Sequence, residues 1–560
     1  MPALLLGGLA LHFSLTLAFL TPLNPIKLRL LPLIDGYIQP FFNQRWSLFA
    51  PNLEAKTRYL LVSCRGEDAR GVSTERPWMN ITLPLHELKQ RYRLTPADRL
   101  ERAQMVGVNQ LEVEDDELSR KLLEKPADTA EYRAAVAFVE QQREGRKRAG
   151  MRLLRRVASR ACAELYPELA APGGARAHGH HPGAAVLPAH GQRGARGHPL
   201  RGAALAALRG AERAMSPAQT TEATAPGWDA LVEWMARPRL LIGASLFRLI
   251  AGAAILIEYL INYAQRGYLF GPGGLFPFAP FVAEMERGPS FSLYAWSGSP
   301  VYFEAVYHLG ILVAALWMLG WHTRLLTPLN YVFLWSLHQR ASGIWDGGDN
   351  IIHLILVYAM FADVGAYFSL DASGGRRAVS GPPGPGARAL AMLHTTAMLA
   401  FAVQISLVYG IAGLYKVQGG VWQDGTALYY AFRGGQFVWP GVTEWFYRDA
   451  LVVTAVTYTT VAYQVAFPFL LFLNRSTRRV AVVLGFTFHL GIALFLGLVT
   501  FSLFMTSVDL ALMGDDEYRA LGRWLTQLQQ RFSTRSAPAP ASLAPDVARA
   551  PSSSTSPPPG

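Results

Sequence analysis

The sequence predicts a mainly α protein, a polytopic bundle of about seven transmembrane helices preceded by a small α+β module with a single membrane anchor. Of its 560 residues, 51% are hydrophobic and only 16% are charged. Apolar runs of membrane-spanning length follow one another from about residue 240 to residue 510. The formal net charge of +12 lies largely in short loops between these runs and in one linker. Membrane proteins distribute cations in this way, so we expect no nucleic-acid partner.

The chain begins with an apolar run, residues 3–21, that is about long enough to cross a bilayer. No basic residue precedes it and no small-residue cleavage site follows it, so we expect a membrane anchor over residues 1–22 rather than a cleaved signal peptide. A polar module over residues 23–162 follows. It contains an aromatic segment at 41–52 and a strand-like stretch at 58–64, and then charged stretches that are typical of solvated helix faces.

The two cysteines, Cys64 and Cys162, could pair only in an oxidising compartment. Neither has the neighbours or the spacing of a metal or redox motif. The sequence therefore predicts no functional role for them.

Residues 163–236 are predicted to be a low-complexity linker, because much of this stretch is Ala, Gly, Arg, His and Pro without any periodicity that could build a core. Its three clustered histidines, His178, His180 and His181, fit a compositionally biased tract better than a metal site. A further hypothesis is that the tract is translated out of its natural frame, since Met215 then opens a segment that resembles a fresh amino terminus.

The membrane domain is predicted over residues 237–512. Residues 513–560 are predicted to contain one amphipathic helix and then a disordered tail rich in Ser, Ala and Pro. The predicted spans within the membrane domain are 240–263, 301–320, 325–340, 351–370, 389–414, 451–473 and 480–504.

Basic residues predict the orientation of these spans, because Lys and Arg near span ends are retained in the cytoplasm. The opposite loops carry thinly spread cations that acidic residues partly offset, which places the Gly-Pro loop at 271–280 and Lys416 on the outer side. Nine arginines fall on the predicted inner side: Arg237, Arg239, Arg324, Arg376, Arg377, Arg388, Arg475, Arg478 and Arg479.

The front of the chain conflicts with this orientation. An anchor that starts inside would place residues 22–157 outside, whereas Arg237 must be inside, and no apolar run lies between them. Either the first span starts outside, as Lys27 and Arg29 after it favour, or the two halves were meant to be separate chains.

Ionisable groups within spans are costly and usually face a bundle interior. Arg248 and Glu258 lie ten residues apart, close to three helical turns, so they share one helix face and are expected to tie helices together. Similar single residues are expected to form hydrogen bonds between helices: His308, His353, His394, Gln404, Gln464 and Asp509. No two histidines recur at metal-ligand spacing on one predicted helix, so we expect no metal.

The segment 408–425, VYGIAGLYKVQGGVWQDG, ends an apolar span in Gly-rich backbone with a single lysine, Lys416. A lysine held at a membrane boundary among Tyr409, Tyr415 and Trp422 is partly desolvated, which favours the neutral amine and makes it a usable base. The alternative is a lysine that extends to the interface beneath an aromatic belt.

The run from Arg239 to Leu512 resembles the HTTM family, the membrane domain shared with vitamin K-dependent γ-carboxylase. The resemblance is carried by SLFRLIAGA at 245–253, YGIAGLYK at 409–416 and TFHLGIALFLG at 487–497. It implies that Lys416 is the catalytic base, and that a reduced quinone (a vitamin K hydroquinone), oxygen and carbon dioxide are the cofactors. Supporting site residues are predicted to be Arg248, Asp349, Asn350, His489, Tyr409 and Trp422.

The sequence departs from the carboxylase in three places. Asp349 or Asn350, in WDGGDN, stands nearest to a catalytic-site histidine of that enzyme, and Gly491 and Ile492 follow His489 where the enzyme has polar residues. The large lumenal domain that grips glutamyl substrates has no counterpart here. Glutamate carboxylation is therefore not the leading expectation.

QRWSLFAPN at 44–52, behind one anchor and ahead of a small polar module, looks like the sporulation-delaying protein A family, and the HTTM-like run resembles protein B of the same system. This resemblance implies that the two modules act together to mature a secreted peptide toxin.

We therefore expect a multi-pass protein of a bacterial inner membrane that modifies or processes a peptide toxin precursor at the outer face, with Lys416 as general base. One alternative is a quinol-dependent carboxylase or epoxidase. Another is a non-catalytic export, immunity or scaffold protein.

Overall fold

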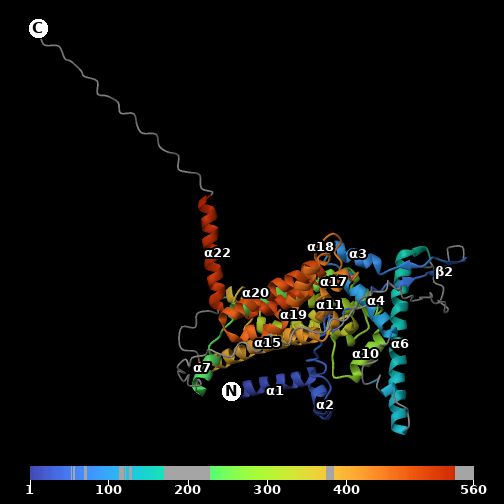
Figure 1. The fold of residues 1–560 in the computed structure, drawn as a ribbon, viewed down its shortest axis with the longest axis horizontal. Helices are drawn as coiled ribbons and strands as arrows, with labels where there is room; N and C mark the ends of the chain where they lie inside the picture. The colour runs from blue at the N-terminus through green and yellow to red at the C-terminus, as the bar shows by residue number, and fades with distance from the viewer. Residues whose placement is uncertain are drawn as a thin grey trace, which may run out of the picture. The chain divides into compact units, whose positions relative to one another are not determined.

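The computed structural model is mainly helical, which confirms the predicted fold class (Figure 1). The chain forms two compact units, Met1–Gly514 and Asp515–Gly560, which are described separately. The predicted histidine cluster at 178–181 lies outside the described residues. Those residues are 1–51, 53, 57–67, 72–112, 119, 122–124, 129–169, 227–373, 384–535 and 560.

Six helices among the described residues are long and apolar enough to cross a membrane. This confirms a multi-pass membrane protein. The six are α1 (Pro2–Leu20), α8 (Leu241–Ile261), α11 (Pro300–Leu319), α15 (Pro385–Val417), α19 (Ala450–Leu473) and the continuous stretch Arg475–Leu496, which joins α20 (Arg475–Gly491) to a π turn (Ile492–Leu496).

Two predicted spans are wrong in extent. The span predicted at 351–370 is the short helix α13 (Gly347–Ala359), and irregular backbone follows it. The guanidinium of Arg248 donates to the carbonyls of Val364, Tyr367 and Phe368 in that backbone. Non-helical backbone within a bundle is tolerated where protein groups satisfy it in this way.

The other wrong prediction is the span at 480–504, which the structure divides. After α20 and the π turn, Gly497 adopts a positive φ of 72°, and α21 (Val499–Ala511) begins. Only glycine takes this conformation without strain, so Gly497 ends the helix. The apolar pattern continues across the break, and for this reason the sequence did not reveal it.

The remaining helices of the membrane bundle, which we define as α7 to α21, include α12 (Thr323–Arg340), which is buried over most of its length. The shorter helices are α7 (Trp228–Ala236), α9 (Arg266–Leu269), α10 (Phe278–Arg287), α14 (Leu370–Ser373), α16 (Gly420–Gln423), α17 (Ala427–Arg433) and α18 (Thr443–Tyr447). The second unit contains α22 (Asp515–Arg535), where the sequence predicts an amphipathic helix.

The N-terminal module, defined here as the described residues from 23 to 169, is a small α+β region. Two antiparallel strand pairs form its sheets, β1 (Leu61–Val62) with β4 (Met79–Asn80) and β2 (Arg65–Glu67) with β3 (Ser73–Glu75). A disulfide links Cys64 beside the strands to Cys162 near the end of the longest helix. The helices are α2 (Pro25–Ile38), α3 (Leu83–Arg91), α4 (Ala97–Leu111) and α6 (Ala130–Leu165).

Arg237 and Arg388, two of the residues predicted to lie inside, meet at one end of the bundle, where both contact Glu233. Arg388 at the start of α15 pairs with Glu233 of α7 at 3.2 Å. Leu5 and Leu6 of α1 pack against Met235 and Ala236 of α7. Helix α1 therefore begins at the same end of the bundle as α7, the end that the basic residues predict to lie inside, and the choice between the two alternatives for the anchor stays a prediction.

Lys27 has a structural role at the end of α1. Its ammonium donates to the carbonyls of Phe19 and Thr21 at 2.6 and 2.7 Å, and so caps the last turn of α1.

The N-terminal module lies at the opposite end of the bundle from α7 (Figure 1). Disulfides persist in oxidising compartments, so the pair of Cys64 and Cys162 fits the outward orientation predicted for that end, which stays a prediction.

Helices α3 and α4 are joined by ion pairs. Lys89 contacts Asp98 at 3.0 Å and Glu101 at 2.8 Å, and Arg102 contacts Asp98 at 2.7 Å. Burial raises the pKa of Asp98, but Arg102 and Lys89 outweigh burial and hold this pKa well below its ordinary value. Burial also raises the pKa of Glu101, but His86 and Lys89 outweigh burial and lower this pKa below its ordinary value.

The disulfide makes the orientation testable. Intact spheroplasts treated with a membrane-impermeant reductant and then with an impermeant maleimide are expected to gain label on both cysteines. Without reduction they are expected to gain none, because Cys64 and Cys162 are paired. Labelling that requires permeabilised membranes would place the module inside and contradict this orientation.

The ion pairs predict acid sensitivity. Both carboxyl pKa values are lower in the folded state than in the unfolded chain, so their stabilisation is present above the ordinary pKa of about 4 and is lost as the pH falls below it. The thermal midpoint of the detergent-purified protein should fall between pH 6 and pH 3. Asp98→Asn should lower the midpoint at pH 7 and flatten this dependence, whereas Glu140→Gln, an exposed control on α6, should do neither. An identical pH profile for Asp98→Asn would contradict the argument.

Candidate functional site

A cavity of about 590 Å³ lies among the membrane helices, and its walls are mainly apolar. Helix α15 contributes Tyr409 and Lys416, α19 contributes Gln464, and α20 contributes His489. Further parts of the wall come from α13, α16, α17, α18, the π turn and α21 of the bundle, and from residues 45–49 of the N-terminal module. The site is therefore composite, since neither the bundle nor the module encloses it alone.

Lys416 is 4% exposed and lies on the cavity wall. Its ammonium donates to the carbonyl of Leu48 at 3.1 Å and contacts that of Ala412 at 3.5 Å. It also lies 5.1 Å from the centre of the Trp422 ring. Within the described part of the chain Lys416 forms no ion pair with a carboxylate. A buried amine without a counter-ion is an unusual and costly arrangement.

A hydrogen-bonded chain of three side chains lies along the same cavity. The hydroxyl of Tyr409 donates to Asp509 at 2.7 Å and lies 2.8 Å from Nε2 of His489. Nδ1 of His489 and Oε1 of Gln464 are buried, and neither has a hydrogen-bond partner among the described residues. Both residues line the cavity, although these two atoms themselves are not exposed to it.

The segment Gln44–Pro51 of the N-terminal module is fixed to the bundle by hydrogen bonds at both ends. Gln44 and Gln404 exchange side-chain hydrogen bonds of 3.1 and 2.8 Å, and the indole of Trp422 donates to the carbonyl of Phe49 at 2.9 Å. Phe49 has a positive φ of 57°, which is strained for an aromatic residue. These contacts hold the carbonyl of Leu48 against Lys416.

A second cavity, of about 390 Å³, lies on the other face of this segment and is more polar. Ser47, Leu48 and Phe49 line both cavities. The ion-paired side chains of α3 and α4, including Lys89 and Glu101, form part of its wall. The segment therefore separates an apolar space in the bundle from a polar space in the N-terminal module.

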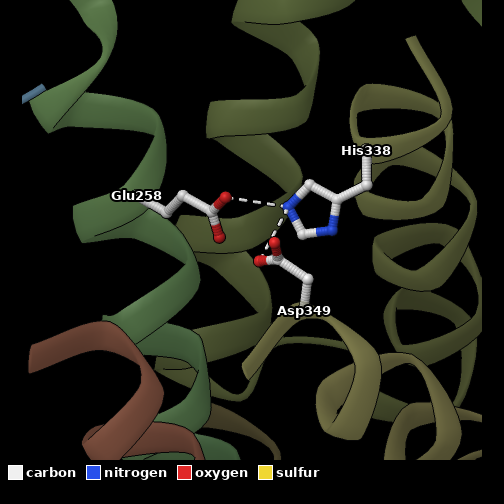
Figure 2. A group of neighbouring side chains, drawn as sticks. All are labelled: Glu258, His338 and Asp349. Atoms are coloured by element: carbon white, nitrogen blue, oxygen red, sulfur yellow. Dashed lines mark hydrogen bonds and ion pairs between the residues drawn. The ribbon is translucent and has the colours of Figure 1, made fainter. Parts of the chain in front are cut away.

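Arg99 of α4 enters a buried group of three side chains in the bundle, Glu258, His338 and Asp349, which come from three different helices (Figure 2). It binds both oxygens of Asp349 at 2.6 and 2.7 Å and one oxygen of Glu258 at 2.6 Å. His338 contacts the same oxygen of Glu258 at 2.8 Å. Removal of one partner from such a buried group costs about 3–5 kcal/mol.

The structure brings four of the predicted site residues together around one cavity: Lys416, Tyr409, Trp422 and His489. The other three lie elsewhere. Arg248 is at the inner end, Asp349 is bound by Arg99, and Asn350 donates to the carbonyl of Asn43 at 2.7 Å.

Arg248 and Glu258 do not pair with each other, since each has its own partners. The expected links between helices form at His353 with His338 and at Asp509 with Tyr409, and His308 bonds to Tyr263 in the 3-10 helix after α8. His394 and Gln404 bond instead to residues outside the helices, the backbone of Arg239 and the side chain of Gln44.

Sequence reasoning missed three contributors to these sites, namely Leu48, Phe49 and Arg99. The motif at 44–52 was visible, but its use as a cavity wall depends on a contact between residues nearly 370 positions apart. Arg99 lies in a polar helix with no signal that separates it from surface arginines. The group around Glu258 was missed because its members come from different helices.

Comparison with known proteins identifies both halves of the chain. Residues 288–514 match the HTTM domain, and residues 24–174 match a family of unknown function, DUF5819. The sporulation-delaying protein SdpB of Bacillus subtilis (strain 168) is 22% identical over 294 residues, which cover 51% of this chain and 84% of that protein. No solved structure matches.

These matches confirm the resemblance to the HTTM family and to protein B of the sporulation-delaying system. The resemblance of the N-terminal module to protein A is not confirmed, because the matching family has no known function. The chain is thus a multi-pass cell-membrane protein that carries an HTTM domain at residues 288–514 and is homologous to SdpB.

Proposed function

We propose that this protein is a membrane enzyme that modifies or processes a secreted peptide at the outer face, with Lys416 as the general base. The observation that carries the proposal is a buried lysine without a carboxylate partner at the wall of a largely apolar cavity. Desolvation favours the uncharged amine, which is the form that accepts a proton.

The surroundings of Lys416 support a reaction rather than a structural role. A lysine that only anchors a helix end reaches water, whereas this one turns to a backbone carbonyl and an aromatic ring inside the protein. His489 and Gln464 line the same cavity, and each has a buried polar atom without a hydrogen-bond partner among the described residues. With Lys416, the cavity wall thus carries a base and two further polar side chains.

A reduced quinone fits this cavity by its polarity and size. The walls are mainly apolar and about 590 Å³ is enough for a small aromatic molecule. Lys416 would face a phenolic hydroxyl, and His489 and Gln464 would hold the ring in place. A reduced quinone would supply, together with oxygen, a base that is stronger than an amine. The residues therefore support the quinol-dependent alternative as a version of the same proposal.

The peptide substrate is suggested by the homology to SdpB, whose name links it to sporulation delay. A peptide released outside the cell would reach the polar cavity beside the segment Gln44–Pro51 first. Ser47, Leu48 and Phe49 of that segment line both cavities, so they would lie between the peptide and Lys416. A transporter usually carries paired broken helices in internal repeats, and no such symmetry is visible in the sequence.

Lys416→Ala should abolish maturation of a small peptide encoded near this protein and leave membrane insertion intact, because the base is lost while the apolar contacts of α15 remain. Mass spectrometry of the secreted peptide, with and without the variant, measures the effect. Lys147→Ala, which removes an exposed lysine of α6, is the matched control and should mature the peptide normally. Full maturation by Lys416→Ala would end the assignment of the base.

A further inference from the structure

The group of Glu258, His338 and Asp349 lies at the contact between the N-terminal module and the membrane bundle. We propose that these three side chains form a cation socket, and that Arg99 is its built-in occupant, by which the bundle recognises and holds the N-terminal module. This inference gives the module of unknown function a task, and it is independent of the chemistry proposed for Lys416.

The geometry of the socket suits a cation. One ligand atom from each of its three side chains lies within 4.8 Å of the others (Figure 2). The two carboxylates are 1% exposed and the histidine is 3% exposed. Two negative charges at this depth need a positive partner, because water cannot reach them.

Arg99 meets this need with its whole guanidinium. One nitrogen donates to Asp349 and to the carbonyl of Ile344 at 2.7 Å, and the other bridges Asp349 and Glu258. A lysine could not make these contacts together, because its single nitrogen lacks the planar fork of arginine.

One socket atom still lacks a partner. Oε2 of Glu258 is buried and has no hydrogen-bond partner among the described residues, although its other oxygen binds both Arg99 and His338. Arg99 therefore does not use every ligand atom of the socket. With Arg99 absent, its carboxylate oxygens and imidazole nitrogen would suit a divalent metal such as zinc.

The socket is connected to the wall of the cavity at Lys416. Asp349 lies in the first turn of α13, where its carboxylate also accepts the backbone N–H of Asp346. Gly347 begins the same helix and lines the cavity, packed against Phe501. Arg99 is thus a positioning residue, since it fixes the start of α13 from the side of the N-terminal module.

Hydrogen exchange of the full-length protein in lipid nanodiscs tests the docking. In Arg99→Ala, exchange should rise at least tenfold in both α4 (Ala97–Leu111) and the first turn of α13. Arg76→Ala is the matched control, because Arg76 pairs with Glu168 within the module, and it should leave both segments unchanged. Unchanged exchange in Arg99→Ala would overturn the proposal.

Zinc binding distinguishes a vacated cation socket in Arg99→Ala from a general loss of stability in this variant. Wild type should bind no zinc at this position, Arg99→Ala should bind one ion per chain, and Arg99→Ala with Glu258→Gln should lose it. Zinc should restore protection of α13 in Arg99→Ala but not of α4, since the metal satisfies the carboxylates without holding the module. A stoichiometric metal in purified wild type, or no zinc site in Arg99→Ala, would overturn the proposal.

A second variant keeps the test open if Arg99→Ala does not fold. Glu258→Gln with Asp349→Asn preserves side-chain volume but removes the charges that attract Arg99. Exchange of α4 should then rise while α15 stays protected. Protection of α4 equal to that of wild type would show that the socket does not hold the module.

Discussion

Charge burial governs how the two halves of this protein fit together. The guanidinium of Arg99 lies between Glu258 and Asp349, far from water, and each of these groups would be costly to bury alone. The bundle therefore contains two buried carboxylates that contact His338 of the bundle and also bind a cation from outside it. Helix α4 provides this cation, and the ion pairs between α3 and α4 hold the rest of the module in place behind it.

Lys416 shows the opposite arrangement. Its ammonium has a carbonyl from the N-terminal module and an aromatic ring nearby, but no carboxylate among the described residues. A residue kept in this state at a cost to stability is typical of functional sites, where strain and unpaired groups gather. The strained backbone of Phe49 next to Leu48 fits the same pattern.

Much of the bundle could be predicted because hydrophobic length is a strong signal. The prediction of helix ends failed at Gly497, because apolar residues continue across the break in the helix. It also failed after α13, because irregular backbone there is stabilised by hydrogen bonds from the distant side chain of Arg248. At the site, Lys416 and its aromatic neighbours could be found because they lie in one short segment. Leu48 and Arg99 could not, because their roles depend on how two separate modules pack.

The composite cavity also has a consequence for which changes can reach the site. The wall formed by Ser47, Leu48 and Phe49 belongs to the N-terminal module, whereas Lys416 belongs to the bundle. A change that loosens the module therefore alters the space at Lys416 even when every residue of the bundle is intact.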